Sequence, residues 1–229
     1  MSEDGAMNTT HTHGADDQNW DEIYGEEQVW SGNANVALVA AMEGKLADLP
    51  VGRALDVGCG EGGDAVWLAE RGWRVTALDV AEGALARGRH AAEARGEKVA
   101  GNIEWVHSGL LEAGLAPGLF NLVSAFYPAL RKTEEKAIEL SLPALVAPGG
   151  VLLVVAHDGI DREAALERGF DPDDYVAPDD IVAALPHGWQ VERYTAERHV
   201  TEGRGAHHHA DVVVIARRSA ESGGVDAQE

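Results

Sequence analysis

Short apolar runs alternate with segments of helical periodicity along the middle of the chain. The apolar runs predict seven β-strands, at residues 53–57, 74–79, 103–107, 120–125, 151–156, 189–196 and 211–217. Apolar positions spaced by three and four residues predict helices between them, near residues 35–47, 63–71, 82–95, 132–146 and 178–185. This alternation indicates an α/β fold with a mostly parallel sheet and helices on both of its faces.

The last two predicted strands differ from the others in how they are connected. Their connector includes the stretch ERHVTEGRG, which is rich in turn formers and has no helical face. Parallel neighbours need a crossover, whereas a short turn-rich connector suits an antiparallel pair. The final strand is therefore predicted to run antiparallel to the one before it.

The two ends of the chain lack apolar periodicity. Residues 1–17 are polar and acidic, whereas residues 219–229 are rich in Ser, Gly and acidic residues, and we expect both to be disordered tails. The remainder, residues 18–218, has the length of one domain, with residues 18–50 ahead of the sheet and residues 157–178 as a flap between the fifth strand and the next helix.

Charge and hydropathy restrict the partners. The chain has 18 basic and 39 acidic residues, a formal net charge of −21, which argues against nucleic acid as a partner because phosphates would be repelled. No stretch approaches the ~20 apolar residues that a membrane span needs, so we expect no membrane partner and a cytoplasmic location. The sequence gives no indication of the oligomeric state.

A glycine-rich loop follows the first predicted strand. Gly58, Gly60 and Gly62 allow a ligand to approach the backbone closely, because they carry no Cβ atom. Asp79 ends the second strand, 21 residues beyond Gly58, where one carboxylate can accept from both hydroxyls of a ribose. The loop therefore predicts a cofactor that contains adenosine.

The glycines alone leave two cofactors open. Residues 58–63 satisfy G-x-G-x-x-G, the dinucleotide pattern, and with Asp56 they also satisfy D-x-G-x-G-x-G. An anionic pyrophosphate gains nothing from the Asp56 carboxylate, whereas the ammonium and sulfonium of S-adenosylmethionine are cations. On these residues, the stretch from Arg53 to Asp79 resembles the class I S-adenosylmethionine-dependent methyltransferases. The triplet Pro148-Gly149-Gly150 also matches the usual lead-in to that family's fifth strand.

The resemblance implies a fold and a set of cofactor contacts. It implies a Rossmann-like sheet of order 3-2-1-4-5-7-6 with an antiparallel last strand, S-adenosyl-L-methionine as cofactor and S-adenosyl-L-homocysteine as product. Gly109 stands where the family often has an acid for the adenine amino group, so the candidate substitute acceptors are Ser108 and backbone carbonyls. The implied cofactor-binding residues are Trp30, Asp56, Gly58, Gly60, Gly62, Asp79, Val80, Ser108, Gly109, Leu110 and Ser124. For the two aspartates the alternative is a purely structural role, as a turn cap and a strand end, and Leu110 is alternatively a core residue.

The methyl acceptor is expected beside the fourth and fifth strands. Phe126 and Tyr127 follow the fourth strand and are predicted to contact the acceptor, with Tyr127 also a candidate for catalysis. His157 follows the fifth strand and is a candidate general base near neutral pH. The alternatives are aromatic packing for the first two and a hydrogen-bonded surface residue for the histidine.

Large aromatic residues stand out in the polar segment before the sheet. Trp20, Tyr24 and Trp30 resemble the N-terminal lid of the thiopurine and tellurite-resistance type of small-molecule methyltransferases. That resemblance implies that Trp20 and Tyr24 contact the substrate, while Trp30 contacts the cofactor. The alternative is an amphipathic helix that covers a sheet edge.

Two other features invite a chemical interpretation. The triplet His207-His208-His209 and the nearby His199 suggest a metal ligand set, but alternate side chains of a strand point to opposite faces, so no metal site is expected. The single cysteine, Cys59, lies inside the glycine loop and is expected to be a packing residue rather than a nucleophile.

The preferred hypothesis is an S-adenosylmethionine-dependent methyltransferase that moves a methyl group to a small-molecule nucleophile. Catalysis would be by in-line displacement, with positioning and exclusion of water. The alternatives are an NAD(P)-dependent Rossmann oxidoreductase, a non-catalytic sensor of S-adenosylmethionine and a histidine-based metal-binding protein.

Overall fold

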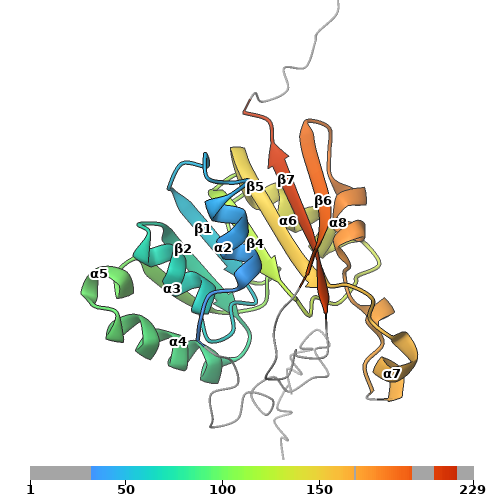
Figure 1. The fold of residues 1–229 in the computed structure, drawn as a ribbon, viewed down its shortest axis with the longest axis horizontal. Helices are drawn as coiled ribbons and strands as arrows, with labels where there is room; N and C mark the ends of the chain where they lie inside the picture. Colours follow the sequence, from blue (N-terminus) through green and yellow to red (C-terminus); the bar gives the residue numbers. More distant parts are fainter. Residues whose placement is uncertain (1–31, 168, 198–208, 221–229) are drawn as a thin grey trace, which may run out of the picture.

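One seven-stranded sheet organises the protein (Figure 1). A computed structural model describes residues 32–167, 169–197 and 209–220. The strand order is β3-β2-β1-β4-β5-β7-β6, and β7 runs antiparallel to both of its neighbours. The predicted order 3-2-1-4-5-7-6 and the antiparallel last strand are therefore confirmed.

All seven predicted strands are present. Their bounds are β1 Arg53–Val57, β2 Arg74–Asp79, β3 Ile103–His107, β4 Phe120–Phe126, β5 Val146–His157, β6 Trp189–Glu197 and β7 Ala210–Arg218. The helices are α2 Val36–Glu43, α3 Gly63–Glu70, α4 Glu82–Ala94, α5 Glu97–Ala100, α6 Ala137–Leu145, α7 Arg162–Glu167 and α8 Pro178–Ala184, with a 3-10 helix η1 at Pro172–Asp174.

Two boundaries differ from the prediction by five residues: β5 begins at Val146 instead of residue 151, and α6 begins after its predicted start at residue 132. The helix begins at Ala137, because the preceding Lys136 has a left-handed backbone with φ of +54°. The hydroxyl of Thr133 accepts a hydrogen bond from the Ala137 N–H at 2.8 Å and so caps the helix. A local cap therefore overrides the apolar spacing upstream of it.

The core lies on both faces of the sheet. Along β5, Val151, Leu153 and Val155 pack on the side of α2 and α3, while Leu152 and Val154 pack on the side of α6 and α8. Figure 1 shows α2 crossing one face of the sheet, with α6 and α8 behind it. A strand that is buried on both faces reads as a continuous apolar run, as the sequence of β5 does.

The carboxyl ends of β1 to β5 meet at one edge of this sheet, which we call the carboxyl edge. Ligands of open α/β sheets bind at this edge, beside the point where the strand order reverses. Here that point lies between β1 and β4, the two strands on either side of the reversal. Within the described ranges, no helix combines the length and the apolar character that crossing a membrane requires.

Candidate functional site

The glycine loop between β1 and α3 has a left-handed backbone conformation, which costs free energy for residues that carry a Cβ atom. Gly58, Gly60 and Gly62 have φ values of +67°, +53° and +74°, all left-handed. The N–H of Gly58 donates to the Leu78 carbonyl at 2.8 Å, and the N–H of Gly60 donates to the Asp79 carboxylate at 2.7 Å. The loop is thus fixed to the end of β2.

The space around these glycines differs from one to the next. A Cβ atom at Gly62 would collide with the indole ring of Trp105, whereas a Cβ atom at Gly58 would meet nothing within 4 Å. Gly62 is therefore needed for packing as well as for its backbone conformation. Gly58 borders open space, which is the position that a ligand lying against the loop requires.

Asp56 lies at the end of β1 with a buried and incompletely satisfied carboxylate. The residue is 2% exposed, and its Oδ1 accepts a hydrogen bond from the Ser124 hydroxyl at 3.3 Å. Its Oδ2 has no hydrogen-bond partner among the described residues. Burial raises the pKa of Asp56 well above its usual value, and repulsion from Asp64 raises it further. A cation beside Oδ2 would relieve both effects.

Asp64 and Asp79 add two more acids to the same loop. Burial raises the pKa of Asp64 to about 6, although its carboxylate accepts a hydrogen bond from the Asn35 N–H at 2.6 Å. Burial also raises the pKa of Asp79, whose two oxygens accept from the N–H groups of Gly60 and Ala81. Each carboxylate oxygen has two lone pairs, so Asp79 retains the capacity to accept from a ribose.

Ser124, a predicted cofactor contact, is fully buried, with an exposed fraction of 0%. Its hydroxyl lies within hydrogen-bond distance of the Leu55 carbonyl at 3.2 Å as well as of Asp56. Ser124 is also the register partner of Asp56 on β4. It therefore supports the Asp56 carboxylate, and its contact with the cofactor stays a prediction.

The predicted adenine contacts lie around the end of β3. Val80 is 38% exposed, whereas Leu110 is almost fully buried, so Val80 is the more accessible of the two predicted apolar contacts. The hydroxyl of Ser108 donates to the Gly109 carbonyl at 3.0 Å. A Cβ atom at Gly109 would collide with the Glu112 carboxylate, so an acid does lie at this position, supplied from three residues downstream. The sequence pattern did not reveal Glu112.

A second polar cluster lies two strands away from β1. The Tyr127 hydroxyl donates to Asp211 Oδ2 at 2.7 Å, and His157 Nδ1 lies 3.1 Å from Asp211 Oδ1. The rings of Tyr127 and His157 stack, with centroids 4.2 Å apart. The structure thus brings the two predicted catalytic residues together, next to the predicted acceptor contact Phe126 at the end of β4.

Sequence reasoning missed Asp211, although a signal for it exists. Asp211 pairs directly with His157 in the register of β5 and β7. Because the last strand is antiparallel, its first residues lie at the same edge as the last residues of β5. An acid at the start of an antiparallel final strand is therefore a site candidate.

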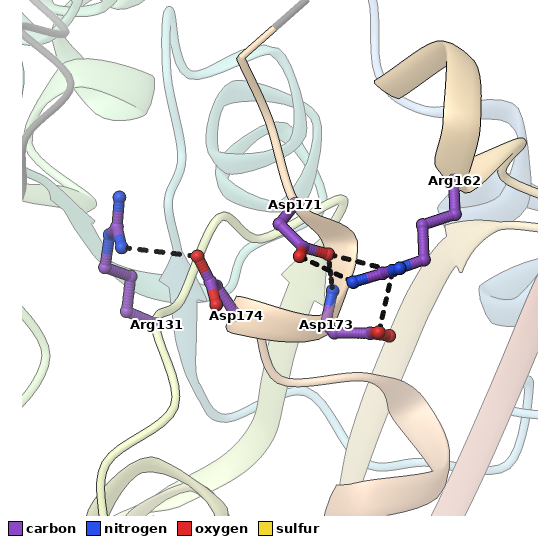
Figure 2. Close-up of polar contacts among 5 residues, drawn as sticks. All are labelled: Arg131, Arg162, Asp171, Asp173 and Asp174. Atoms are coloured by element: carbon purple, nitrogen blue, oxygen red, sulfur yellow. Dashed lines mark hydrogen bonds and ion pairs between the residues drawn. The ribbon is translucent and has the colours of Figure 1, made fainter. Parts of the chain in front are cut away.

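The predicted flap, residues 157–178, contains α7 and η1. Figure 2 shows Arg162 of α7 reaching two acids at η1, with its guanidinium 2.7 Å from Asp171 and 2.8 Å from Asp173. Arg131, just beyond β4, reaches Asp174 at 3.8 Å, and the N–H of Lys132 donates to the Asp174 carbonyl at 2.8 Å. The flap is thus attached to the segment that follows Tyr127.

Several predicted features lie outside the described residues. These are Trp20, Tyr24 and Trp30 of the expected lid, together with His199, His207 and His208. His209 is described and is exposed. Among the described residues, no group of three His, Cys, Asp or Glu side chains is arranged to hold a metal ion. Burial raises the pKa of the Cys59 thiol well above its usual value, which disfavours a nucleophilic role.

Comparison with known proteins bears on the two cofactor patterns. Residues 54–150, which contain the glycine loop and both strand-end aspartates, match the family described as "Methyltransferase domain". This match covers less than half of the 229 residues. An uncharacterized methyltransferase of Mycobacterium tuberculosis is 36% identical over 132 residues, which cover 56% of this chain and 61% of that protein. The tRNA 5-carboxymethoxyuridine methyltransferase of Escherichia coli K12 is 30% identical over 112 residues, covering 46% of this chain and 40% of that protein. The matched regions thus span less than two thirds of these relatives.

Solved structures agree with the methyltransferase domain in fold. A chain from the study "Conversion of a Disulfide Bond into a Thioacetal Group during Echinomycin Biosynthesis" has a TM-score of 0.64 and 25% identity, over 90% of this chain and 94% of that one. The N-methyltransferase NodS from Bradyrhizobium japonicum WM9, in complex with S-adenosyl-L-homocysteine, has a TM-score of 0.58 and 19% identity, over 80% of this chain and 84% of that one. At that identity the second likeness concerns the fold alone.

Proposed function

We propose that the chain is an S-adenosylmethionine-dependent methyltransferase that acts on a small-molecule nucleophile. The observation that carries this proposal is the buried Asp56 carboxylate, of which one oxygen has no hydrogen-bond partner among the described residues. Two residues further along the chain, Gly58 borders open space. S-adenosylmethionine supplies a methyl group on a positively charged sulfur. Asp56 would hold the cationic methionine end of this cofactor.

Electrostatics favour a cationic ligand over a dinucleotide. Asp56, Asp64 and Asp79 all have raised pKa values, for which burial is the leading cause, so each gains from a neighbouring positive charge. An anionic pyrophosphate in the same place would add repulsion to the cost of burial. The donors and the open space of the loop fit S-adenosylmethionine, and the match to a methyltransferase domain supports the same choice.

The adenosine end would lie between β2 and β3. Asp79 would accept from the ribose hydroxyls, and the exposed side chain of Val80 would cover one face of the adenine. Glu112, which lies over Gly109, would accept from the adenine amino group in place of the acid that the family often has at that position. This assignment removes the one misfit between the sequence and the family pattern.

A small molecule is favoured as the acceptor by charge. The net charge of −21 repels nucleic acid, and the acids of the carboxyl edge add to this repulsion locally. By resemblance to thiopurine and tellurite-resistance type enzymes, Trp20, Tyr24 and Trp30 would close over the bound cofactor. The flap would cover the acceptor from the other side and exclude water during the displacement.

Calorimetric titration tests the cofactor. Purified protein should bind S-adenosylmethionine and S-adenosylhomocysteine but not NAD. Asp56→Asn and Asp79→Ala should each weaken binding of both compounds at least tenfold, because each removes a charge-assisted contact. Glu93→Gln, an exposed acid on α4, is the matched control and should bind normally. Tight binding of NAD alone would replace this proposal with an oxidoreductase.

Transfer of a labelled methyl group tests the acceptor class. The protein is incubated with methyl-labelled S-adenosylmethionine and, in separate reactions, with a small-molecule fraction of cell extract or with total RNA. Label is expected in the small-molecule fraction only. Since the relatives include a tRNA methyltransferase, incorporation into RNA is the outcome that would overturn the small-molecule part of the proposal.

A further inference from the structure

In the cluster of Tyr127, His157 and Asp211, the other two side chains hold the His157 ring in one orientation. Asp211 is 5% exposed and takes a hydrogen bond from the Tyr127 hydroxyl on one oxygen, while His157 lies against its other oxygen. The stacked tyrosine ring fixes the plane of the imidazole. His157 ends β5, Asp211 lies in β7, and Tyr127 directly follows β4.

The backbone of Tyr127 adds an independent observation. Its φ of +49° is left-handed, a conformation that a residue with a bulky side chain rarely adopts. Its N–H donates to the Val155 carbonyl at 2.7 Å, which holds the strained turn against β5. Strain of this kind persists where the surroundings fix a side chain for function. Here it directs the phenol onto His157 and Asp211.

We propose that His157 is the general base of methyl transfer, that Asp211 and Tyr127 are its positioning residues, and that the acceptor is a hydroxyl compound of phenol type. This inference rests on the proposed function. The acceptor class follows from the cluster, because a thiolate or another preformed anion needs no base. A hydroxyl that is protonated at neutral pH does need one.

The hydrogen bond to Asp211 decides which nitrogen of His157 acts. A carboxylate only accepts, so the neutral imidazole carries its proton on Nδ1 and its lone pair on Nε2. During transfer, the C–O bond forms as the C–S bond of the sulfonium breaks, and the hydroxyl proton passes to Nε2. The products are a methyl ether, S-adenosylhomocysteine and an imidazolium that Asp211 stabilises and that then releases its proton to water.

Tyr127 is excluded as the base by the same contacts. Its hydroxyl donates its own proton to Asp211, so it is engaged as a donor. Tyr127 therefore supports Asp211, and its removal should cost less than removal of the histidine. The order of expected effects is His157→Gln, then Asp211→Asn, then Tyr127→Phe.

A matched pair of acceptors tests the proposal. 2-Naphthol is protonated at pH 8, whereas 2-naphthalenethiol has the same ring and is largely ionised. His157→Gln should lower kcat for the naphthol at least about 100-fold and Asp211→Asn at least about tenfold, with little change in KM or in transfer to the thiol. His187→Gln, an exposed histidine before β6, is the control. Equal losses on both acceptors, or no loss on the naphthol, would overturn the proposal.

A second measurement needs neither cofactor nor acceptor. Nitrogen-15 NMR of the His157 ring, assigned with His157→Gln, should show the Nδ1–H tautomer in the wild type and in Tyr127→Phe, and its loss in Asp211→Asn. A wild-type Nε2–H tautomer overturns the inference even where neither probe reacts. Failure of the protein to bind S-adenosylhomocysteine would instead contradict the proposed methyltransferase function. The NMR and binding measurements therefore distinguish failure of the general-base inference from failure of the proposed function.

Discussion

The carboxylates in the two halves of the carboxyl edge differ in their pKa shifts and in their hydrogen-bond partners. In the half that we propose binds the cofactor, called the cofactor half and lying beside β1 and β2, burial raises the pKa values of Asp56, Asp64 and Asp79. In the half that we propose holds the acceptor, called the acceptor half and lying beside β4, β5 and the flap, Asp211 is bonded to Tyr127 and His157. There the Asp173 backbone N–H and the Arg162 guanidinium lower the pKa of Asp171.

This difference indicates which half is completed by a ligand. Buried carboxylates without cations cost free energy, and a binding partner with positive charge recovers that cost. Carboxylates that already have donors gain little from such a partner and instead fix the side chains around them. The cofactor half is thus suited to bind a positively charged group. In the acceptor half, the carboxylates instead fix the positions of neighbouring side chains.

The largest expected effect comes from breaking the packing of the cofactor half at Gly62. Gly62→Ala should lower the free energy of unfolding by about 3 kcal/mol, because the new Cβ atom meets Trp105 in a left-handed backbone. Gly58→Ala shares the backbone penalty but not the collision, so it should cost only about 1 kcal/mol. Urea denaturation measures both changes.

The same pair of variants separates folding from binding. The methyl group at Gly58 enters the open space assigned to the cofactor, so Gly58→Ala should weaken S-adenosylhomocysteine binding while the fold survives. Trp105→Leu in the Gly62→Ala background should recover part of the lost stability, since it removes the colliding ring. Equal stability losses at the two glycines would show that Trp105 does not set the requirement.

Replacing the buried Asp64 by a neutral residue tests the difference between the two halves. The replacement should stabilise the protein and weaken cofactor binding. The folded pKa of Asp64, about 6, lies above its usual value of 3.8, so its stabilising contribution is present below pH 4 and is lost as the pH rises through about 6. Asp64→Asn keeps an oxygen for the Asn35 N–H and should be more stable than wild type by about 1–3 kcal/mol at pH 7.

The pH dependence separates this effect from a general loss of charge. At pH 4 the Asp64→Asn variant and the wild type should unfold at nearly the same temperature. Glu93→Gln removes one charge from an exposed position and should not change the melting temperature at either pH. A stabilisation of Asp64→Asn that persists at pH 4 would contradict the ionisation argument.

The two halves also differ in how far the sequence revealed them. In the cofactor half, Asp56, the glycines and Asp79 lie within one short stretch, so a linear pattern contains these proposed site residues. In the acceptor half, Asp211 lies 54 residues from His157 and 84 from Tyr127, and only the register of β5 and β7 brings them together. Periodicity predicts that strands exist but not which residues they place opposite each other.

Side-chain direction accounts for the remaining contacts that the sequence did not reveal. Ser124 has the position expected of a lining residue, but its hydroxyl turns to Leu55 and Asp56 and is covered. Glu112 has no place in the family pattern, and it reaches Gly109 only because its side chain folds back over the loop. Such contacts depend on rotamers, which a sequence pattern does not encode.

A smaller effect is expected from Glu112, the acid assigned to the adenine. Glu112→Ala should weaken S-adenosylhomocysteine binding about five- to tenfold, the loss of about 1 kcal/mol that one hydrogen bond contributes. Glu104→Ala, at an exposed acid on β3, is the control and should bind normally. Calorimetry distinguishes the two, and equal affinities would return the adenine contact to Ser108 or the backbone.

The smallest effect is expected in the acceptor half, at the ion pairs of the flap. Arg162→Gln removes the contacts with Asp171 and Asp173 shown in Figure 2, but all three groups are at the surface, where solvent screens such pairs. The melting temperature should not change measurably. Amide hydrogen exchange in residues 162–174 should become faster, because α7 and η1 lose their connection.

Arg193→Gln breaks an exposed pair with Asp179 on α8 and should leave the exchange of the flap unchanged. Faster exchange in both variants would mean that Arg162 has no particular role in holding the flap, and the acceptor half would then be less rigid than its paired carboxylates indicate.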